Sequence, residues 1–189
     1  PTRTMVVDST PKFDLSGGPV IHTGNELDVA IRGEQGWFAV QLPDGAEAYT
    51  RNGSFTVNEN GVLQTHQGYN VLDENNQIIN IPPYTRVTIG EDGVISTVEE
   101  QNQTSAQVNI IARLKLVNPD VDNIIKSGDA MFRTKDGTIP ASDPLIRVSQ
   151  GYVEGSNVNP AEILVKTINL GRMFELQMKA IETIESNAQ

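Results

Sequence analysis

The sequence contains no cysteine, and this absence excludes several classes of site. Disulfide bonds, zinc–thiolate centres and cysteine nucleophiles all need a thiol. The 189 residues also lack a run of 18 apolar residues, the length that a membrane-spanning helix requires. Pro1 to Asp8 have no apolar stretch of the kind found in signal peptides. We therefore expect neither membrane insertion nor a cleaved signal peptide.

Basic and aromatic residues are also scarce. The 14 Lys and Arg residues are outnumbered by 24 Asp and Glu residues, which gives a formal net charge of −10. Such a chain repels phosphate backbones, so binding to nucleic acid is not expected. Aromatic residues are few, whereas there are 16 Gly and 10 Pro. This composition favours short strands and tight turns over a helical bundle.

Turn dipeptides recur through residues 19–155, which we interpret as a β-rich body domain. They are Asp44-Gly45, Asn52-Gly53, Asn60-Gly61, Asp92-Gly93 and Asp136-Gly137. Asn-Gly and Asp-Gly reach the positive φ angles of type I′ hairpin turns. The fold class that follows is mainly β, rich in hairpins, with one long C-terminal α-helix.

Two apolar runs in this body are strand candidates. Leu27 to Ile31 alternates apolar with small or polar residues, which is typical of a half-buried strand. Val108 to Val117 is the longest candidate, and we predict a central strand with one solvent-exposed, or wet, face. Its buried face would hold Ile110, Ala112, Leu114 and Leu116, and its wet face Asn109, Ile111, Arg113 and Lys115. Residues 99–107 are predicted to form a solvated loop, and residues 1–18 an irregular entry arm.

A helix is predicted within residues 156–189, the third segment of the chain. Asn159 suits the N-cap and Pro160 the first helical position, while Glu162 is placed to reach back toward the cap. The heptad spacing predicts an assembly face; it consists of Ile163, Thr167, Leu170, Phe174, Gln177, Ile181 and Ile184, widened by Leu164, Ile168 and Met178. This face could pack on the body, on a second helix or on another subunit.

No residue pattern predicts a catalytic site, a metal site or a cofactor. His22 and His66 have no ligand partner at metal-binding spacing. Asp120, Asp122 and Asp129 do not match a calcium loop. The acid pairs Glu91-Asp92 and Glu99-Glu100 point to opposite faces of a strand, and Ser54 lacks a nucleophile elbow.

Three classes of function stay open on these residues alone. The first is a structural subunit that assembles through its helix. The second is an enzyme such as a wall-cutting hydrolase, which would need two carboxylates converging in a cleft. The third is a non-catalytic β binding module, which would expose aromatic residues in a cleft. The single tryptophan, Trp37, lies in an apolar run and is expected in the core.

Four stretches, in order, resemble the flagellar basal-body rod and hook family over nearly the whole chain. They are Leu27-Asp28-Val29-Ala30-Ile31 with Gly36 to Val40, then Tyr49-Thr50-Arg51-Asn52-Gly53-Ser54-Phe55 with Gly61, Leu63 and Gly68-Tyr69, then Gly151 to Pro160 including Ser156-Asn157-Val158, and Arg172 to Lys179. Within the family, Gly36-Trp37 and the Arg172–Lys179 run are most similar to proximal-rod members, with distal-rod members second.

The resemblance implies a structural subunit rather than an enzyme, with no cofactor and no small-molecule substrate. Family members leave the cell through the flagellar type III apparatus without a cleaved signal and polymerise axially across the periplasm into a drive shaft. Their partners are other rod proteins and copies of themselves. The family also begins with an N-terminal helical segment that is missing here. We therefore expect this sequence to be a fragment whose C-terminal helix lacks its N-terminal mate.

Overall fold

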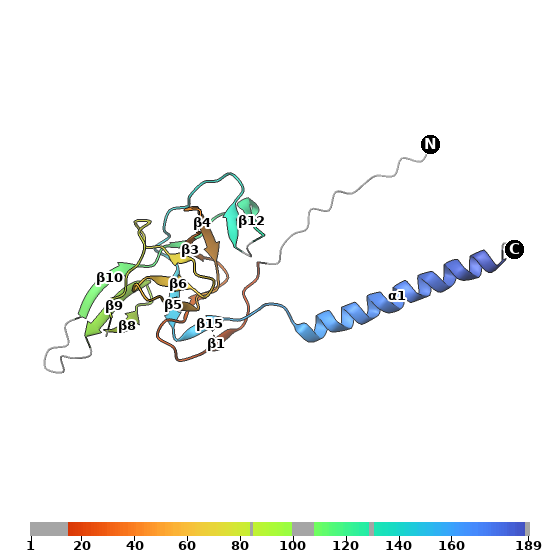
Figure 1. The fold of residues 1–189 in the computed structure, drawn as a ribbon, viewed down its shortest axis with the longest axis horizontal. Helices are drawn as coiled ribbons and strands as arrows, with labels where there is room; N and C mark the ends of the chain where they lie inside the picture. Colours follow the sequence, from red (N-terminus) through yellow and green to blue (C-terminus); the bar gives the residue numbers. More distant parts are fainter. Residues whose placement is uncertain (1–14, 84, 100–107, 129–130, 188–189) are drawn as a thin grey trace. The chain divides into compact units, whose positions relative to one another are not determined.

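The computed structural model describes residues 15–83, 85–99, 108–128 and 131–187, with no side chain described beyond Ile181. The chain divides into two units, each described by itself: a body that ends at Gly155 and a C-terminal unit that begins at Ser156. Figure 1 shows short strands in the body and one helix in the C-terminal unit. The predicted fold class is confirmed.

The body consists of short strands. They are β1 (Val20–His22), β2 (Val29–Arg32), β3 (Trp37–Gln41), β4 (Glu47–Thr50), β5 (Phe55–Val57), β6 (Leu63–Thr65), β7 (Asn70–Val71), β8 (Thr85–Ile89), β9 (Val94–Glu99), β10 (Val108–Arg113), β11 (Leu116–Val117), β12 (Ile124–Lys126), β13 (Phe132–Thr134), β14 (Arg147–Gln150) and β15 (Tyr152–Glu154). A 3₁₀ turn, η1 (Val121–Asn123), precedes β12, and the helix is α1 (Pro160–Asn187).

The strands pair antiparallel in four sheets. The largest runs in the order β12-β13-β4-β3-β7-β6-β5, with β11 also paired to β3. A second sheet, at the left of the body in Figure 1, has the order β10-β9-β8. β14 pairs with β2, and β1 pairs with β15. The first and last strands of the body therefore form one ribbon, directly before the chain enters the C-terminal unit.

The core lies on both faces of β3. Phe38 contacts Phe55 edge to face, with ring centroids 5.2 Å apart, inside the larger buried cluster. On the other face, the ring of Trp37 lies 4.5 Å from that of Phe132 in a second cluster. Trp37 is only 7% exposed, so it is a core residue as predicted.

Three of the predicted hairpins form, but with a different turn type. Gly45, Gly61 and Gly93 have φ angles of 84°, 82° and 81° and close the hairpins β3–β4, β5–β6 and β8–β9. Among the residues that the structure describes, Asn76 is the one non-glycine residue with positive φ. A type I′ turn needs positive φ at both central residues, so that turn type was wrong. A single left-handed glycine is typical of the G1-bulge loop instead.

β13 and β14, which flank Asp136-Gly137, lie in different sheets, so no hairpin forms there. The prediction of a hairpin at Asn52-Gly53 was wrong as well. β4 and β5, which flank this dipeptide, pair with other strands and not with each other. Gly53 lies against β2, where its carbonyl accepts a hydrogen bond from the Val29 amide at 2.9 Å. A Cβ at this position would lie 1.8 Å from the Val29 carbonyl oxygen. Glycine is therefore needed here for close backbone approach.

Both long strand candidates also differ from prediction. In β2, Val29, Ala30 and Ile31 are all at most 1% exposed, so the strand is buried on both faces instead of half-buried. Val108–Val117 is not one central strand: β10 lies at a sheet edge, and β11 belongs to another sheet.

A β-bulge between Ile110 and Ala112 changes which side chains of this segment are buried. Ile110, predicted to be buried, is 75% exposed, whereas Lys115, predicted on the wet face, is 3% exposed. The extra residue shifts the alternation of faces, and the chain then crosses between sheets. Two predicted segments lie mostly outside the described residues. Of the loop predicted over 99–107, only Glu99 is described, at the end of β9. The entry arm is not described up to residue 14.

Candidate functional site: the Arg51 clamp and helix α1

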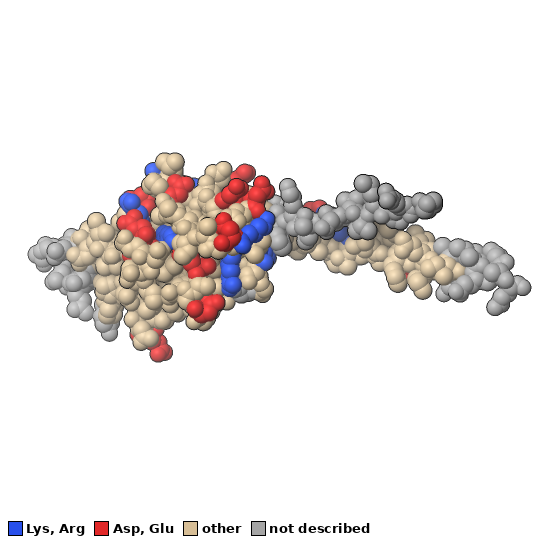
Figure 2. Space-filling view, turned by 90° about the horizontal axis from the view of Figure 1, so that it is seen from above, with Lys and Arg blue, Asp and Glu red and all other residues tan. Residues whose placement is uncertain are grey.

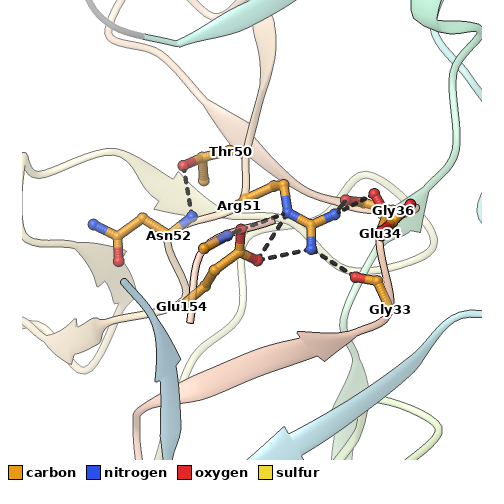
Figure 3. A network of polar contacts seen from close by, with 8 residues as sticks. Gly33, Glu34, Gly36, Thr50, Arg51, Asn52 and Glu154 are labelled. Carbon is orange, nitrogen blue, oxygen red and sulfur yellow. Dashed lines mark hydrogen bonds and ion pairs between the residues drawn. The ribbon is translucent and has the colours of Figure 1, made fainter. Parts of the chain in front are cut away.

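Arg51, from the second of the four family-like stretches, follows β4 and binds two distant parts of the chain (Figure 3). Its Nε donates to both carboxylate oxygens of Glu154, at 3.0 and 2.8 Å. Its Nη1 donates to the carbonyls of Glu34 and Gly36, and its Nη2 to that of Gly33. We call this set, Arg51 with Glu154 and the three carbonyls, the Arg51 clamp.

The two charged side chains of the clamp are largely shielded from solvent. The side chains of Arg51 and Glu154 are 11% and 9% exposed, and Nη2 of Arg51 lies 2.7 Å from Glu154 Oε2. Every nitrogen of the guanidinium group therefore has an acceptor. A buried ion pair contributes little against an apolar alternative, but removal of one partner leaves an uncompensated charge that costs about 3–5 kcal/mol.

The clamp holds the strand at which the body ends. Glu154 is the last residue of β15, and its Oε1 also accepts a hydrogen bond from the Gly18 amide at 3.1 Å. The next residue, Gly155, donates its amide to the Pro19 carbonyl at 2.9 Å. The chain is thus fixed to the body up to the residue before the C-terminal unit.

The other residues of the two N-terminal stretches support this arrangement. The Asn52 amide donates to Thr50 Oγ1, and Asn52 Oδ1 accepts from the Ser54 amide, which shapes the turn after β4. Leu27 packs against the larger core cluster. Tyr49 is 1% exposed, and burial, together with the nearby Glu47 carboxylate, raises the pKa of its hydroxyl above the usual range.

Asp28, Ser54 and His66 come together beside this turn. Ser54 Oγ donates to Asp28 Oδ1 at 2.8 Å and lies 3.1 Å from His66 Nε2. The serine is in the middle, whereas a Ser-His-Asp triad has the histidine between the other two. The Ser54 hydroxyl therefore bridges the side chains of Asp28 and His66. The arrangement is a structural hydrogen-bond chain.

A buried ion pair that the sequence did not reveal joins the start of β4 to the residue before β11. Lys115 Nζ binds both oxygens of Glu47 at 2.8 Å and Asn76 Oδ1 at 2.6 Å. The side chains of Lys115 and Glu47 are 3% and 7% exposed. Their separation of 68 residues explains why no local signal predicted the pair.

The start of α1 follows the predicted cap in part. Asn159 Oδ1 accepts from the amide of Ala161 at 3.0 Å and of Glu162 at 3.5 Å, and Pro160 is the first helical residue. The Glu162 carboxylate pairs with Lys166 at 2.7 Å, a pairing that lowers the pKa of Glu162. In the preceding segment, Ser156 Oγ accepts from the Val158 amide.

The predicted assembly face of α1 is exposed as far as its side chains are described. The apolar members have exposures of 50% (Ile163), 61% (Leu164), 48% (Ile168), 65% (Leu170), 65% (Phe174), 45% (Met178) and 50% (Ile181). Thr167 and Gln177 are exposed as well, and Thr167 Oγ1 donates back to the Ile163 carbonyl. The side chain of Ile184 lies outside the described part. On the face drawn in Figure 2, the described part of α1 shows few charged atoms, whereas acidic and basic atoms crowd the body.

α1 has a second apolar face, whose residues do not belong to the heptad seam. Val165 and Leu176 are 56% and 67% exposed, and Met173 is 55% exposed. With ~100° per helical residue, Val165 and Leu176 lie nearly opposite Ile163 and Ile181. A search for one heptad seam misses them, although plotting every apolar residue of the helix on a wheel would have found them. Two apolar faces are typical of a helix that contacts more than one neighbour.

Other kinds of site find no support in the described residues. No group of three or more His, Asp or Glu side chains in that part of the chain could hold a metal ion. Asp120 caps η1 by accepting from the Asp122 amide. His22 contacts Tyr152 across β1 and β15, with ring centroids 4.9 Å apart. Within the described residues, no helix is long and apolar enough to cross a membrane.

Comparison with known protein families gives two matches. Residues 30–97 match the model of the flagellar hook protein FlgE/F/G D1 domain. Residues 149–189 match the model of the flagellar basal body rod FlgEFG protein C-terminal region. Arg51 lies in the first matched region and Glu154 in the second, so the Arg51 clamp joins the two.

Individual relatives cover nearly the whole chain. The flagellar basal-body rod protein FlgF of Salmonella typhimurium is 40% identical over 192 residues, which cover 98% of this chain and 75% of the relative. FlgF of Escherichia coli is 39% identical over 194 residues, covering 100% of this chain and 76% of the relative. FlgG of Buchnera aphidicola subsp. Schizaphis graminum is 39% identical over 190 residues, covering 96% and 69%.

These matches define a class of axial structural protein: the chain belongs to the flagellar basal-body rod protein family. It is a structural subunit of the rod and resides in the flagellar basal body, where it assembles with other rod components. The predicted similarity to rod proteins of the FlgF type is confirmed.

Proposed function

We propose that the chain is a subunit of the proximal rod and polymerises axially to form part of the drive shaft between the motor and the hook. The similarity to two proteins named FlgF over nearly the whole chain supports this position. The similarity to FlgG makes a distal-rod subunit the alternative. The chain works in the periplasm after export through the flagellar type III apparatus, and its role is structural and not catalytic.

The observation that carries the proposal is the apolar surface of α1. Nine residues of the assembly face, from Ile163 to Ile181, are exposed; seven are large and apolar, and Thr167 and Gln177 are polar. A contiguous apolar surface of this kind marks a protein interaction site. The occupants are helices of neighbouring rod subunits and of further copies of this chain, because a heptad seam packs against another helix.

The polar seam positions fit assembly on a template. Thr167 and Gln177 interrupt the apolar seam and weaken a stand-alone dimer. A subunit that bound its copies strongly through α1 would polymerise before it reached the growing rod. The weak seam instead leaves assembly to the end of the existing rod, where several helices are already in place.

Replacement of seam residues in a host that lacks its own proximal-rod gene tests this proposal. The full-length gene is returned intact or with Leu170, Phe174 and Ile181 changed to Asp. We expect the intact gene to restore rods and motility, and the seam variant to be produced and exported without restoring either. The matched control changes Leu170, Phe174 and Ile181 to Met, which keeps the seam apolar, and it should assemble.

Either of two results would overturn the proposal. If the intact gene fails to restore rods, the proximal assignment is wrong, and rescue of a distal-rod mutant by the same gene would establish the alternative. If the seam variant restores rods as well as the intact gene does, α1 is not the assembly surface.

A further inference from the structure

The two polar residues of the assembly face differ in their hydrogen bonds. Thr167 Oγ1 donates to the Ile163 carbonyl at 2.9 Å, one turn back in the same helix. The hydroxyl proton of Thr167 therefore has an acceptor within α1, and a helix that covers this position need not supply one. The Gln177 side chain is exposed, and it makes no hydrogen bond to any residue in the described part of the chain.

Gln177 lies between apolar residues of the seam. Phe174 and Ile181, three residues before it and four residues after it, are 65% and 50% exposed. Residues at this spacing are neighbours on one face of a helix, so a helix that packs on Phe174 and Ile181 also covers Gln177. Coverage removes water from the Gln177 carboxamide, and a buried polar group without a partner destabilises the contact. The neighbouring helix must therefore supply the missing hydrogen bonds.

The counterpart that satisfies Gln177 best is another carboxamide. The Gln177 side chain offers two N–H donors and one carbonyl acceptor. A carboxylate only accepts hydrogen bonds and a lysine or arginine only donates them, and each also brings a charge into an apolar layer at a cost in desolvation. A hydroxyl has a single oxygen, which cannot align with both ends of the carboxamide at once. An asparagine or glutamine donates and accepts side by side and stays neutral.

We propose that Gln177 determines which helix binds the assembly face and in which register: the partner helix carries an asparagine or glutamine opposite Gln177. A single polar position in an apolar seam fixes the register of helix pairing at a cost in stability. A helix that is slipped along the seam, or that lacks the carboxamide, leaves Gln177 unpaired and binds less well. Thr167 makes no such selection, since its hydroxyl proton is already bound. This inference rests on the proposed function, in which a helix of another rod subunit covers this face.

Two single variants separate the roles of the polar positions. The full-length gene carries Gln177→Leu or Thr167→Val, in the host that lacks its own proximal-rod gene. Gln177→Leu keeps a side chain of similar size but leaves the partner's carboxamide unpaired, so the number of rods per cell should fall about tenfold or more. Thr167→Val, the matched control, removes a hydroxyl that needs no partner and should leave the number of rods unchanged. Equal numbers of rods with the two variants would overturn the inference.

A scan for a compensating replacement identifies the partner. Each Asn and Gln in the helical segments of the rod proteins, this chain included, is changed singly to Leu in the Gln177→Leu background. One replacement should restore rods, because two apolar side chains then face each other, and the same replacement with Gln177 intact should reduce them. Restoration by none of the replacements overturns the inference. Restoration by Ile163→Thr, which only weakens the seam, also overturns it, because the defect then comes from premature self-association.

The outcomes separate this inference from the proposed function. If rods form although Leu170, Phe174 and Ile181 are all changed to Asp, α1 is not the assembly surface and the proposed function fails. If that variant forms no rods while Gln177→Leu assembles as well as Thr167→Val does, the assembly surface stands and only the selection by Gln177 is overturned.

Discussion

Arg51 connects parts of the chain that the sequence places far apart. Its partner Glu154 is 103 residues away, and the three carbonyls belong to the turn between β2 and β3. The sequence singled out Arg51 within a family-like stretch, but it gave no sign of these partners, because pairings at long range depend on the topology of the whole body.

A double-mutant cycle should reveal the coupling in the Arg51 clamp. Arg51→Met and Glu154→Gln should each lower the free energy of unfolding by about 3–5 kcal/mol, since each leaves one buried polar partner unmatched. The double variant should cost less than the sum of the two. Urea unfolding measures all three.

The exposed pair Arg32–Glu91 is the matched control for that cycle. Its side chains are 51% and 66% exposed, so Arg32→Met and Glu91→Gln should change stability by no more than about 1 kcal/mol. Additive effects of Arg51→Met and Glu154→Gln would show that the two residues do not act as a pair.

Gly53 should tolerate no side chain. Gly53→Ala places a Cβ 1.8 Å from the Val29 carbonyl oxygen, so β2 must separate from the turn. We expect a loss of about 3 kcal/mol or more, at the upper end of overpacking effects. Gly128→Ala, where an added Cβ meets nothing within 4 Å, should be nearly neutral in the same thermal unfolding experiment. Equal stability of the two variants would contradict the close approach.

At the scale of elements, local patterns predicted the helix better than the sheets. The cap at Asn159 and the start at Pro160 were confirmed because both depend on neighbouring residues. The glycine turns predicted three hairpins for the same reason. Gly53, Lys115 and Ile110 were misread, since a close approach, a buried ion pair and a β-bulge each depend on segments distant in sequence.

Two substitutions should change the helicity of α1 in opposite directions. Gly171→Ala should increase helicity, because glycine in a helix interior costs about 1 kcal/mol and an added Cβ meets no atom within 4 Å. Asn159→Ala should decrease it by removing the cap, a loss of about 1 kcal/mol. Circular dichroism at the helix band, followed during heating, measures both effects. A decrease with Gly171→Ala would contradict this account of α1.

At the scale of the whole molecule, the chain consists of a body with its own core and a helix whose apolar surface is exposed. The body buries its own core and fixes its last strand through the Arg51 clamp. The helix exposes apolar residues on two faces. This division fits the proposed function, in which α1 is the surface that joins subunits.

The most direct test of the central claim is the position of this chain in purified basal bodies. A cysteine introduced at the exposed Thr88 and labelled with gold marks the body of each copy, provided that any cysteine encoded outside these 189 residues is replaced by serine. Electron microscopy of the rescued host should show the label on the rod at its motor-proximal end. Label confined to the distal rod, or absent from rods that nevertheless form, would contradict the account.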